Sequence, residues 1–103
     1  MEIIATLDEL KPVLEKDLVL VIAKTHRCSV CATIERQLRQ GIDRFDALES
    51  VVIYIDDHEP YRGFFEMFTV PTVMVYSEGK ELLRESRFVN VEKIKRLIQL
   101  YQS

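Results

Sequence analysis

The chain has few of the residues that mark unusual proteins. Its 103 residues include two cysteines, three glycines, three prolines and no tryptophan. Neither an internal repeat nor a low-complexity linker interrupts it. The missing tryptophan removes a fluorescence probe and carries no information about chemistry. This length and the uniform composition along the chain predict one domain over residues 1–103, built around a single core.

Charge and hydropathy argue against two classes of partner. The net charge is −3, whereas phosphate binding needs a clustered positive field, so no nucleic-acid partner is expected. No apolar run approaches the roughly 20 residues that span a bilayer, so no membrane partner is expected. The N-terminus has neither the basic nor the apolar region of a signal peptide. These absences predict a cytoplasmic protein, and a monomer is the default for its size. In the cytoplasm a close cysteine pair is more often catalytic or metal-binding than structural.

Apolar, β-branched runs alternate with helical patterns along the chain. Strands are expected at residues 3–5, 18–23, 51–55, 72–76 and 81–86. Helical patterns begin after Thr6, Cys28, Glu59 and Asn90. The order βαβαβαββα predicts an α/β fold in which the first three strands run parallel and the last two form a hairpin. One central mixed sheet with helices on both faces is the expected architecture.

Helical spacing assigns faces to two of these helices. The helix after the cysteines is expected to bury Cys31, Ile34 and Leu38. Its charged residues are expected to point outward: Glu35, Arg36 and Arg39. In the next helix three phenylalanines are expected to point into the core: Phe64, Phe65 and Phe68. A partner contact by an exposed Phe64 or Phe65 is the alternative.

Both cysteines lie in the motif Cys28-Ser29-Val30-Cys31, directly after a strand and before a helix. A Cys-x-x-Cys motif at this place in a βαβ pattern indicates a thiol–disulfide redox site. The reactive species is a thiolate, which the N–H groups and dipole at a helix N-terminus stabilise. Cys28 is therefore the candidate nucleophile, and Cys31, one turn further on, is the candidate resolving cysteine that closes a Cys28–Cys31 disulfide. Three nearby residues are candidates for tuning the pKa of Cys28: Lys24, His26 and Arg27.

Two other interpretations of the cysteine pair stay open. A zinc site needs four ligands, and beyond the cysteines only His26 and His58 are obvious, at unsuitable spacing. Alternatively, the cysteines are ordinary core residues, which suits Cys31 on its apolar face but not Cys28. No metal ligand and no cofactor is assigned.

The order of elements, the Cys28–Cys31 motif after the second strand, and Val70-Pro71-Thr72 at the start of the fourth strand resemble the thioredoxin family. The resemblance covers essentially the whole chain. Taken alone, Pro71 is explained as the first residue of a strand, where proline is tolerated. The resemblance implies that the Val70–Pro71 peptide bond is cis and packs against the cysteines. It also implies that the backbone of Val70 pairs with an extended substrate segment.

Several positions depart from the pattern of that family. Arg27 stands where tryptophan is typical, and Ser29-Val30 stands where Gly-Pro is typical. Ile22 and Val52 take the places of a buried aspartate and a buried lysine. That aspartate helps to move a proton when the second cysteine attacks, so its absence predicts slower turnover unless water or another group substitutes. A glycine beside the site is replaced by one of two residues, which would narrow the groove or add a client contact: Arg87 or Phe88.

These observations predict a thiol–disulfide oxidoreductase that reduces protein disulfides. Its partners would be disulfide-containing protein substrates and an electron donor, either an upstream reductase or a low-molecular-weight thiol. One alternative is a thioredoxin-fold adaptor with weak or no turnover, which Ile22 and Arg27 favour. The other is a cysteine-ligated metal site. Two cysteines at redox spacing favour the enzyme, because binding alone requires neither.

Overall fold

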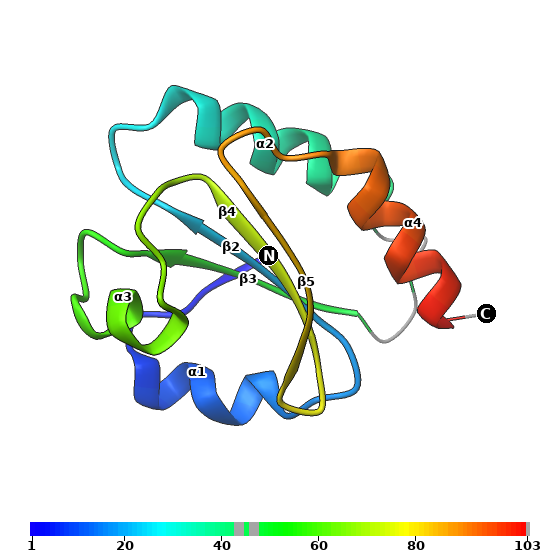
Figure 1. The fold of residues 1–103 in the computed structure, drawn as a ribbon, viewed down its shortest axis with the longest axis horizontal. Coiled ribbons are helices and arrows are strands. Elements are labelled where there is room, and N and C mark those ends of the chain that lie inside the picture. Colours follow the sequence, from blue (N-terminus) through cyan, green and yellow to red (C-terminus); the bar gives the residue numbers. More distant parts are fainter. Residues whose placement is uncertain (43–44, 46–47, 103) are drawn as a thin grey trace.

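The computed structural model describes residues 1–42, 45 and 48–102, and a five-stranded mixed sheet runs through the middle of this part (Figure 1). The strands are β1 (Glu2–Ile3), β2 (Val19–Lys24), β3 (Glu49–Tyr54), β4 (Thr72–Ser77) and β5 (Lys80–Ser86). They lie in the order β1-β3-β2-β4-β5 across the sheet. The strands β1, β3 and β2 are parallel, whereas β4 is antiparallel to β2 and β5 is antiparallel to β4.

Helices cover both faces of this sheet. Those in the described residues are α1 (Leu7–Leu14), α2 (Ser29–Arg39), α3 (Pro60–Phe65) and α4 (Val91–Gln102). α1 and α3 lie on one face, and α2 and α4 lie on the other (Figure 1). Within this part of the chain, no helix combines the length and the apolar character that crossing a membrane requires.

Local sequence signals begin three of the helices. The Oγ1 atom of Thr6 accepts the N–H of Glu9 at 3.3 Å and caps α1. Pro60 occupies the first turn of α3, where its missing N–H costs nothing. The Oδ1 atom of Asn90 accepts the N–H of Lys93 at 3.0 Å before α4. The Thr6 and Asn90 side chains each satisfy a backbone donor that the helix itself leaves unpaired.

The core has two halves because successive residues of a strand point to opposite faces. One half joins alternate residues of β2 to α1 and α3, and it includes Val21, Leu10 and Tyr61. Burial raises the pKa of Tyr61 to about 12, and its hydroxyl donates to the carbonyl of Ile4 at 2.9 Å. The other half joins the remaining β2 residues to α2 and α4, and it includes Leu20, Ile22, Ile34 and Ile98. The central strand β2 is therefore apolar along nearly its whole length.

The expected fold class and the order of its elements are confirmed, with strand boundaries within two residues of those predicted. The prediction for the phenylalanines of α3 is wrong in part. Phe65 is buried, but Phe64 is 45% exposed and Phe68 is 81% exposed. Phe64 lies on the outer side of α3, next to the buried Phe65. For Phe68 the reason is that α3 ends at Phe65, where Glu66 turns into a left-handed conformation with φ of 51°. Phe68 therefore lies beyond the helix, and helical spacing does not apply to it.

Candidate active site

Three segments of the chain meet at one end of the sheet. Ala23 near the end of β2 pairs with Thr72 at the start of β4, and Thr72 pairs with Ser86 at the end of β5. These three residues form a row across the sheet, so the segments 25–28, 69–71 and 87–90 emerge at the same end. The helix α2 also begins there. Residues far apart in the sequence are thereby brought around the two cysteines.

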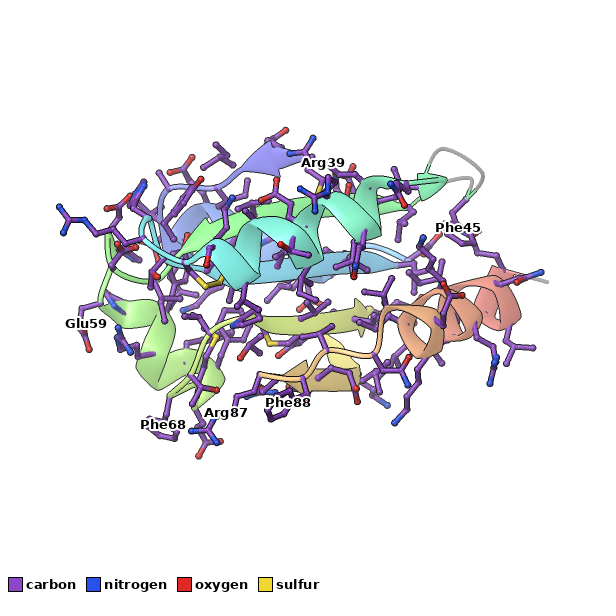
Figure 2. The ribbon with its side chains drawn as sticks, turned by 90° about the horizontal axis from the view of Figure 1, so that it is seen from above. Arg39, Phe45, Glu59, Phe68, Arg87 and Phe88 are labelled. Carbon is purple, nitrogen blue, oxygen red and sulfur yellow. A yellow bond between two sulfur atoms is a disulfide. The ribbon has the colours of Figure 1, made fainter. Side chains whose placement is uncertain are left out.

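Cys28 is the N-cap residue of α2. Its Sγ atom accepts the N–H of Cys31 at 3.1 Å, and its carbonyl accepts the N–H of Ala32 at 3.3 Å. A disulfide joins Cys28 to Cys31 at the start of α2 (Figure 2), with the two Cα atoms 5.2 Å apart. Cys31 is fully buried, whereas Cys28 is half-buried. The Cys28 sulfur is thus the more accessible of the two, and the N–H of Cys31 can stabilise negative charge on it.

The Val70–Pro71 peptide bond is cis. Pro71 is buried and Val70 is half-buried. Two hydrogen bonds hold the segment around them. The Oγ1 atom of Thr72 donates to the carbonyl of Thr69 at 2.8 Å, and the N–H of Arg87 donates to the carbonyl of Pro71 at 2.9 Å. The segment after β5 therefore lies directly against the segment before β4.

Hydrocarbon occupies the two positions where the family resemblance implies an acid and a base. Ile22 and Val52 pair with each other across β2 and β3, and both are buried. They belong to the apolar cluster beneath α2, together with Ile34 and Val73. Neither position offers a proton carrier to the buried Cys31.

A buried ion pair lies on the same face of β2, two residues beyond Ile22. Lys24 Nζ forms a salt bridge with Glu35 Oε1, and their side chains are only 14% and 12% exposed. Arg39 donates to Glu35 Oε2 from Nε at 3.0 Å and from Nη2 at 2.7 Å. The prediction that Glu35 points outward is therefore wrong. A buried ammonium needs an opposite charge, so Lys24 draws the carboxylate to the sheet side of α2.

Both members of this pair stay charged. Burial alone would raise the pKa of Glu35, but the hydrogen bonds from Lys24 and Arg39 outweigh it and hold the pKa below its ordinary value. Burial would lower the pKa of Lys24, but hydrogen bonds with Glu35 and Tyr54 raise it above its ordinary value. The sequence signal for this pair was a lysine at the end of an otherwise apolar strand. Lys24, a predicted tuning residue, is therefore bonded to a carboxylate one helical turn beyond Cys31.

The loop before Cys28 is fastened to the loop after β3. The ring of His26 stacks on Tyr54 with 4.0 Å between centroids, and its Nε2 lies 2.8 Å from Asp57 Oδ2. The hydrogen bond from the protonated ring to the Asp57 carboxylate raises the pKa of His26 above its ordinary value. The backbone N–H of His26 also donates to Asp56 Oδ2 at 3.2 Å. Arg27 is exposed and forms no ion pair within the described part of the chain, which leaves it as the uncompensated cation next to Cys28.

The two histidines weighed as zinc ligands have other contacts. The Nε2 atom of His58 accepts the N–H of Leu7 at 3.1 Å, which ties it to the start of α1. Among the described residues, the group that could jointly hold a metal ion consists of His26, Asp56 and Asp57, and all three are exposed. That group includes neither cysteine.

The geometry defines a class of protein. One half-buried sulfur caps a helix and accepts a backbone N–H, a fully buried sulfur lies one turn behind it, and the two are joined by a bond that thiols can open. A site of this form makes and breaks disulfides.

Comparison with known proteins agrees. No family model matches the chain. The chain is 39% identical over 79 residues to the thioredoxin-like protein YdfQ of Bacillus subtilis, covering 73% of this chain and 70% of that protein. It is 25% identical over 67 residues to the thioredoxin of Mycoplasma genitalium, covering 65% and 66%. The solved structure of Plasmodium falciparum thioredoxin has a TM-score of 0.85 at 19% identity, covering 98% of this chain and 99% of that one.

The chain belongs to the thioredoxin family. With its disulfide between Cys28 and Cys31, it is a thiol–disulfide oxidoreductase, as the cysteine motif predicted.

Proposed function

We propose that this protein reduces disulfide bonds in client proteins, with Cys28 as the attacking cysteine and Cys31 as the resolving cysteine. The hydrogen bond from the Cys31 N–H to the Cys28 sulfur supports this assignment above all. It places a donor on the more accessible sulfur, where a thiolate would need it. Cys31 is fully buried, so its sulfur can attack Cys28 but is not accessible to a disulfide of another molecule.

The reaction transfers two electrons to the client. The Cys28 thiolate attacks one sulfur of the client disulfide, which forms a mixed disulfide and releases the other client sulfur as a thiolate that takes up a proton. Cys31 then loses its proton and attacks Cys28. This forms the Cys28–Cys31 disulfide and releases the second client thiol. Val70 and Pro71 would hold an extended client segment beside the sulfurs, with the Val70 backbone as its hydrogen-bonding partner.

A trapping experiment tests the two roles. Cys31→Ser should accumulate mixed disulfides through Cys28, because nothing remains to resolve them. Cys28→Ser should accumulate almost none, because the remaining thiol is buried. The measurement is gel separation of the trapped adducts under non-reducing conditions, with a model disulfide protein as client. Equal trapping by both variants would contradict the assignment.

The oxidised protein must be reduced again by an outside donor. We place the reaction in the cytoplasm, where dithiol reductases and low-molecular-weight thiols are both available. Recovery of the dithiol form with a monothiol alone would assign the donor to the small thiols. Recovery that needs a protein dithiol would assign it to an upstream reductase. A fluorescent fusion of the full chain tests the compartment.

The buried pair of Ile22 and Val52 favours a second candidate, an adaptor that binds clients with little turnover. Ile22 cannot accept the proton of Cys31, so proton transfer from Cys31 is expected to be slower than in a protein with an aspartate at that position. The two candidates differ in multiple turnover of a disulfide protein with excess reductant. The reductase keeps converting substrate, whereas the adaptor stops after about one equivalent.

A further inference from the structure

The rings of Phe68 and Phe88 stand out from the molecule beside the candidate active site. Their side chains are 81% and 90% exposed, more than any other large apolar residue described. Phe68 precedes Pro71 by three residues. Phe88 follows Arg87, whose N–H is bonded to the carbonyl of Pro71. Figure 2 shows the side chains of Phe68, Arg87 and Phe88 projecting on the same side of the molecule.

Two exposed phenyl rings on segments that are hydrogen-bonded to each other at Pro71 point to contact with another molecule. Each large apolar side chain left in water forgoes stabilisation that burial would give, as it does for the neighbouring Phe65. Val30, between the two cysteines, is also 54% exposed. The apolar area beside the site therefore comprises exposed side chains of the segments next to Pro71 and of the first turn of α2.

Two uncompensated cations accompany this apolar area. Arg27 and Arg87 are both exposed, and neither forms an ion pair within residues 1–42, 45 and 48–102. Four other cations on neighbouring elements are paired: Lys24 with Glu35, His26 with Asp57, Arg62 with Glu59 and Arg84 with Glu81. Arg36 on α2 and Lys80 on β5 are unpaired in the described residues, but they lie toward the far ends of their elements. One negative charge lies near this area: the exposed carboxylate of Glu66, two residues before Phe68.

The backbone of Arg87 adds a further observation. Its φ is 64°, in the left-handed region that favours glycine. An arginine there costs roughly five- to thirtyfold in the folding equilibrium relative to a residue without Cβ. The conformation turns the chain after β5 so that the arginine and Phe88 both face solvent.

We propose that Arg27, Val30, Phe68, Arg87 and Phe88 form a client surface. It would select clients whose disulfide lies in an extended segment carrying carboxylates and a large apolar side chain. This inference rests on the proposed function and names the chemistry of its substrates. Two arginines complement the carboxylates, and the phenyl rings and Val30 cover the apolar side chain. A protein segment is the occupant, because exchange at Cys28 requires a disulfide and a polypeptide supplies both the carboxylates and the apolar side chain beside it.

Three synthetic peptides test the proposal. Each has one cysteine held as a mixed disulfide with 2-thiopyridine, and the flanking residues are glutamate with phenylalanine, lysine with phenylalanine, or glutamate with serine. The protein is reduced beforehand, so its own dithiol supplies both electrons. Cys28 attacks the peptide sulfur and 2-thiopyridone leaves with the electron pair and a proton. Cys31 then closes the disulfide and frees the peptide thiol. The absorbance of 2-thiopyridone gives the rate constant for each peptide.

The glutamate–phenylalanine peptide should react about three- to tenfold faster than the lysine–phenylalanine peptide, since each exposed charge pair contributes only modestly. Added salt should reduce this ratio. Arg87→Glu should bring it to one or below. Phe68→Ser combined with Phe88→Ser should abolish the advantage of phenylalanine over serine. Ratios are compared because they cancel any change in the reactivity of Cys28 itself.

Two matched variants on α4 are the controls. Arg96→Glu makes the same charge change at an exposed residue, and Leu100→Ser removes an apolar side chain that is 66% exposed. Both should keep the wild-type ratios. Equal rates for all three peptides, or an Arg87→Glu ratio equal to that of Arg96→Glu, would overturn the client surface while leaving disulfide reduction intact. If no peptide releases 2-thiopyridone, the proposed function fails instead.

Discussion

Among single residues, two glycines illustrate how backbone conformation constrains this fold. Gly79 lies in the turn between β4 and β5 with φ of 82°, and its N–H donates to the carbonyl of Leu14 at 2.8 Å. A Cβ atom added to it would lie 2.6 Å from Glu15 Oε2. Gly63 lies within α3, and a Cβ atom there would meet nothing within 4 Å. Only the first position requires glycine.

Opposite effects on stability are expected for the same substitution. Gly79→Ala should lower the free energy of unfolding by about 1 to 2 kcal/mol, because alanine is strained at this φ. Gly63→Ala should raise it by about 0.5 to 1 kcal/mol, because alanine favours the helix. Urea unfolding of the two variants measures both. A loss of stability at Gly63 matching that at Gly79 would contradict the argument.

Arg87 is the residue where sequence and structure complement each other. The family resemblance left open whether Arg87 or Phe88 takes the place of a glycine. Of the two residues, Arg87 has the left-handed φ that glycine adopts most easily. No pattern of residue types reveals a single backbone angle, because many residues other than glycine occur in loops.

Among the elements, α2 carries both the redox chemistry and a buried carboxylate. Its first turn holds Cys28 and Cys31, and its sheet side holds Glu35 against Lys24. The carboxylate therefore helps to attach the catalytic helix to the end of β2.

Removing the charge of Glu35 should weaken that attachment. Glu35→Gln should lower the free energy of unfolding by about 2 kcal/mol at neutral pH, because it leaves the ammonium of Lys24 buried without its partner. Glu49→Gln is the matched control, since its ion pair with Lys16 is 42% to 53% exposed and should matter by less than about 1 kcal/mol. Urea unfolding compares the two. A similar loss in both variants would show that burial of the pair is unimportant.

The effect of Glu35 should also depend on pH. The pKa of Glu35 is lower in the folded protein than its ordinary value, so its contribution is complete above the unfolded pKa and disappears as pH falls through the folded pKa. The difference between wild type and Glu35→Gln should therefore be large at about pH 7 and shrink toward about pH 3. A constant difference across this range would contradict the assigned ionisation.

The order of the elements was predictable because apolar runs, caps and turn residues are local. The positions of Glu35 and Phe68 were not. Glu35 is polar and lies beside Arg39 in the helix, so helical spacing placed it outside, whereas its position depends on Lys24 in another element. Phe68 continued a helical spacing, but the helix had already ended at Phe65.

In the molecule as a whole, the site lies at one end of a sheet whose core fills both faces. The contact between Pro71 and Arg87 depends on the hairpin of β4 and β5, which returns the chain to the end where β4 began. The cysteine pair was visible in the sequence because it is local. The segments 69–71 and 87–90 beside the pair could not be placed there from the sequence, because their position arises from strand pairing across the sheet.

Opening the disulfide should leave the protein folded, with a modest loss of stability. The cross-link closes a loop of only four residues, so its loss should lower the free energy of unfolding by no more than about 2 kcal/mol. Urea unfolding with and without dithiothreitol measures the difference, and a Cys28→Ser, Cys31→Ser double variant should not respond to the reductant. Loss of the folded circular dichroism signal on reduction would contradict this expectation.

The short span of that cross-link has a practical meaning for a working catalyst. The bond joins parts of one helical turn and ties no distant pieces of the chain together. Each cycle of electron delivery can therefore break it and remake it while the architecture stands unchanged, and the molecule is ready for another client without having to refold.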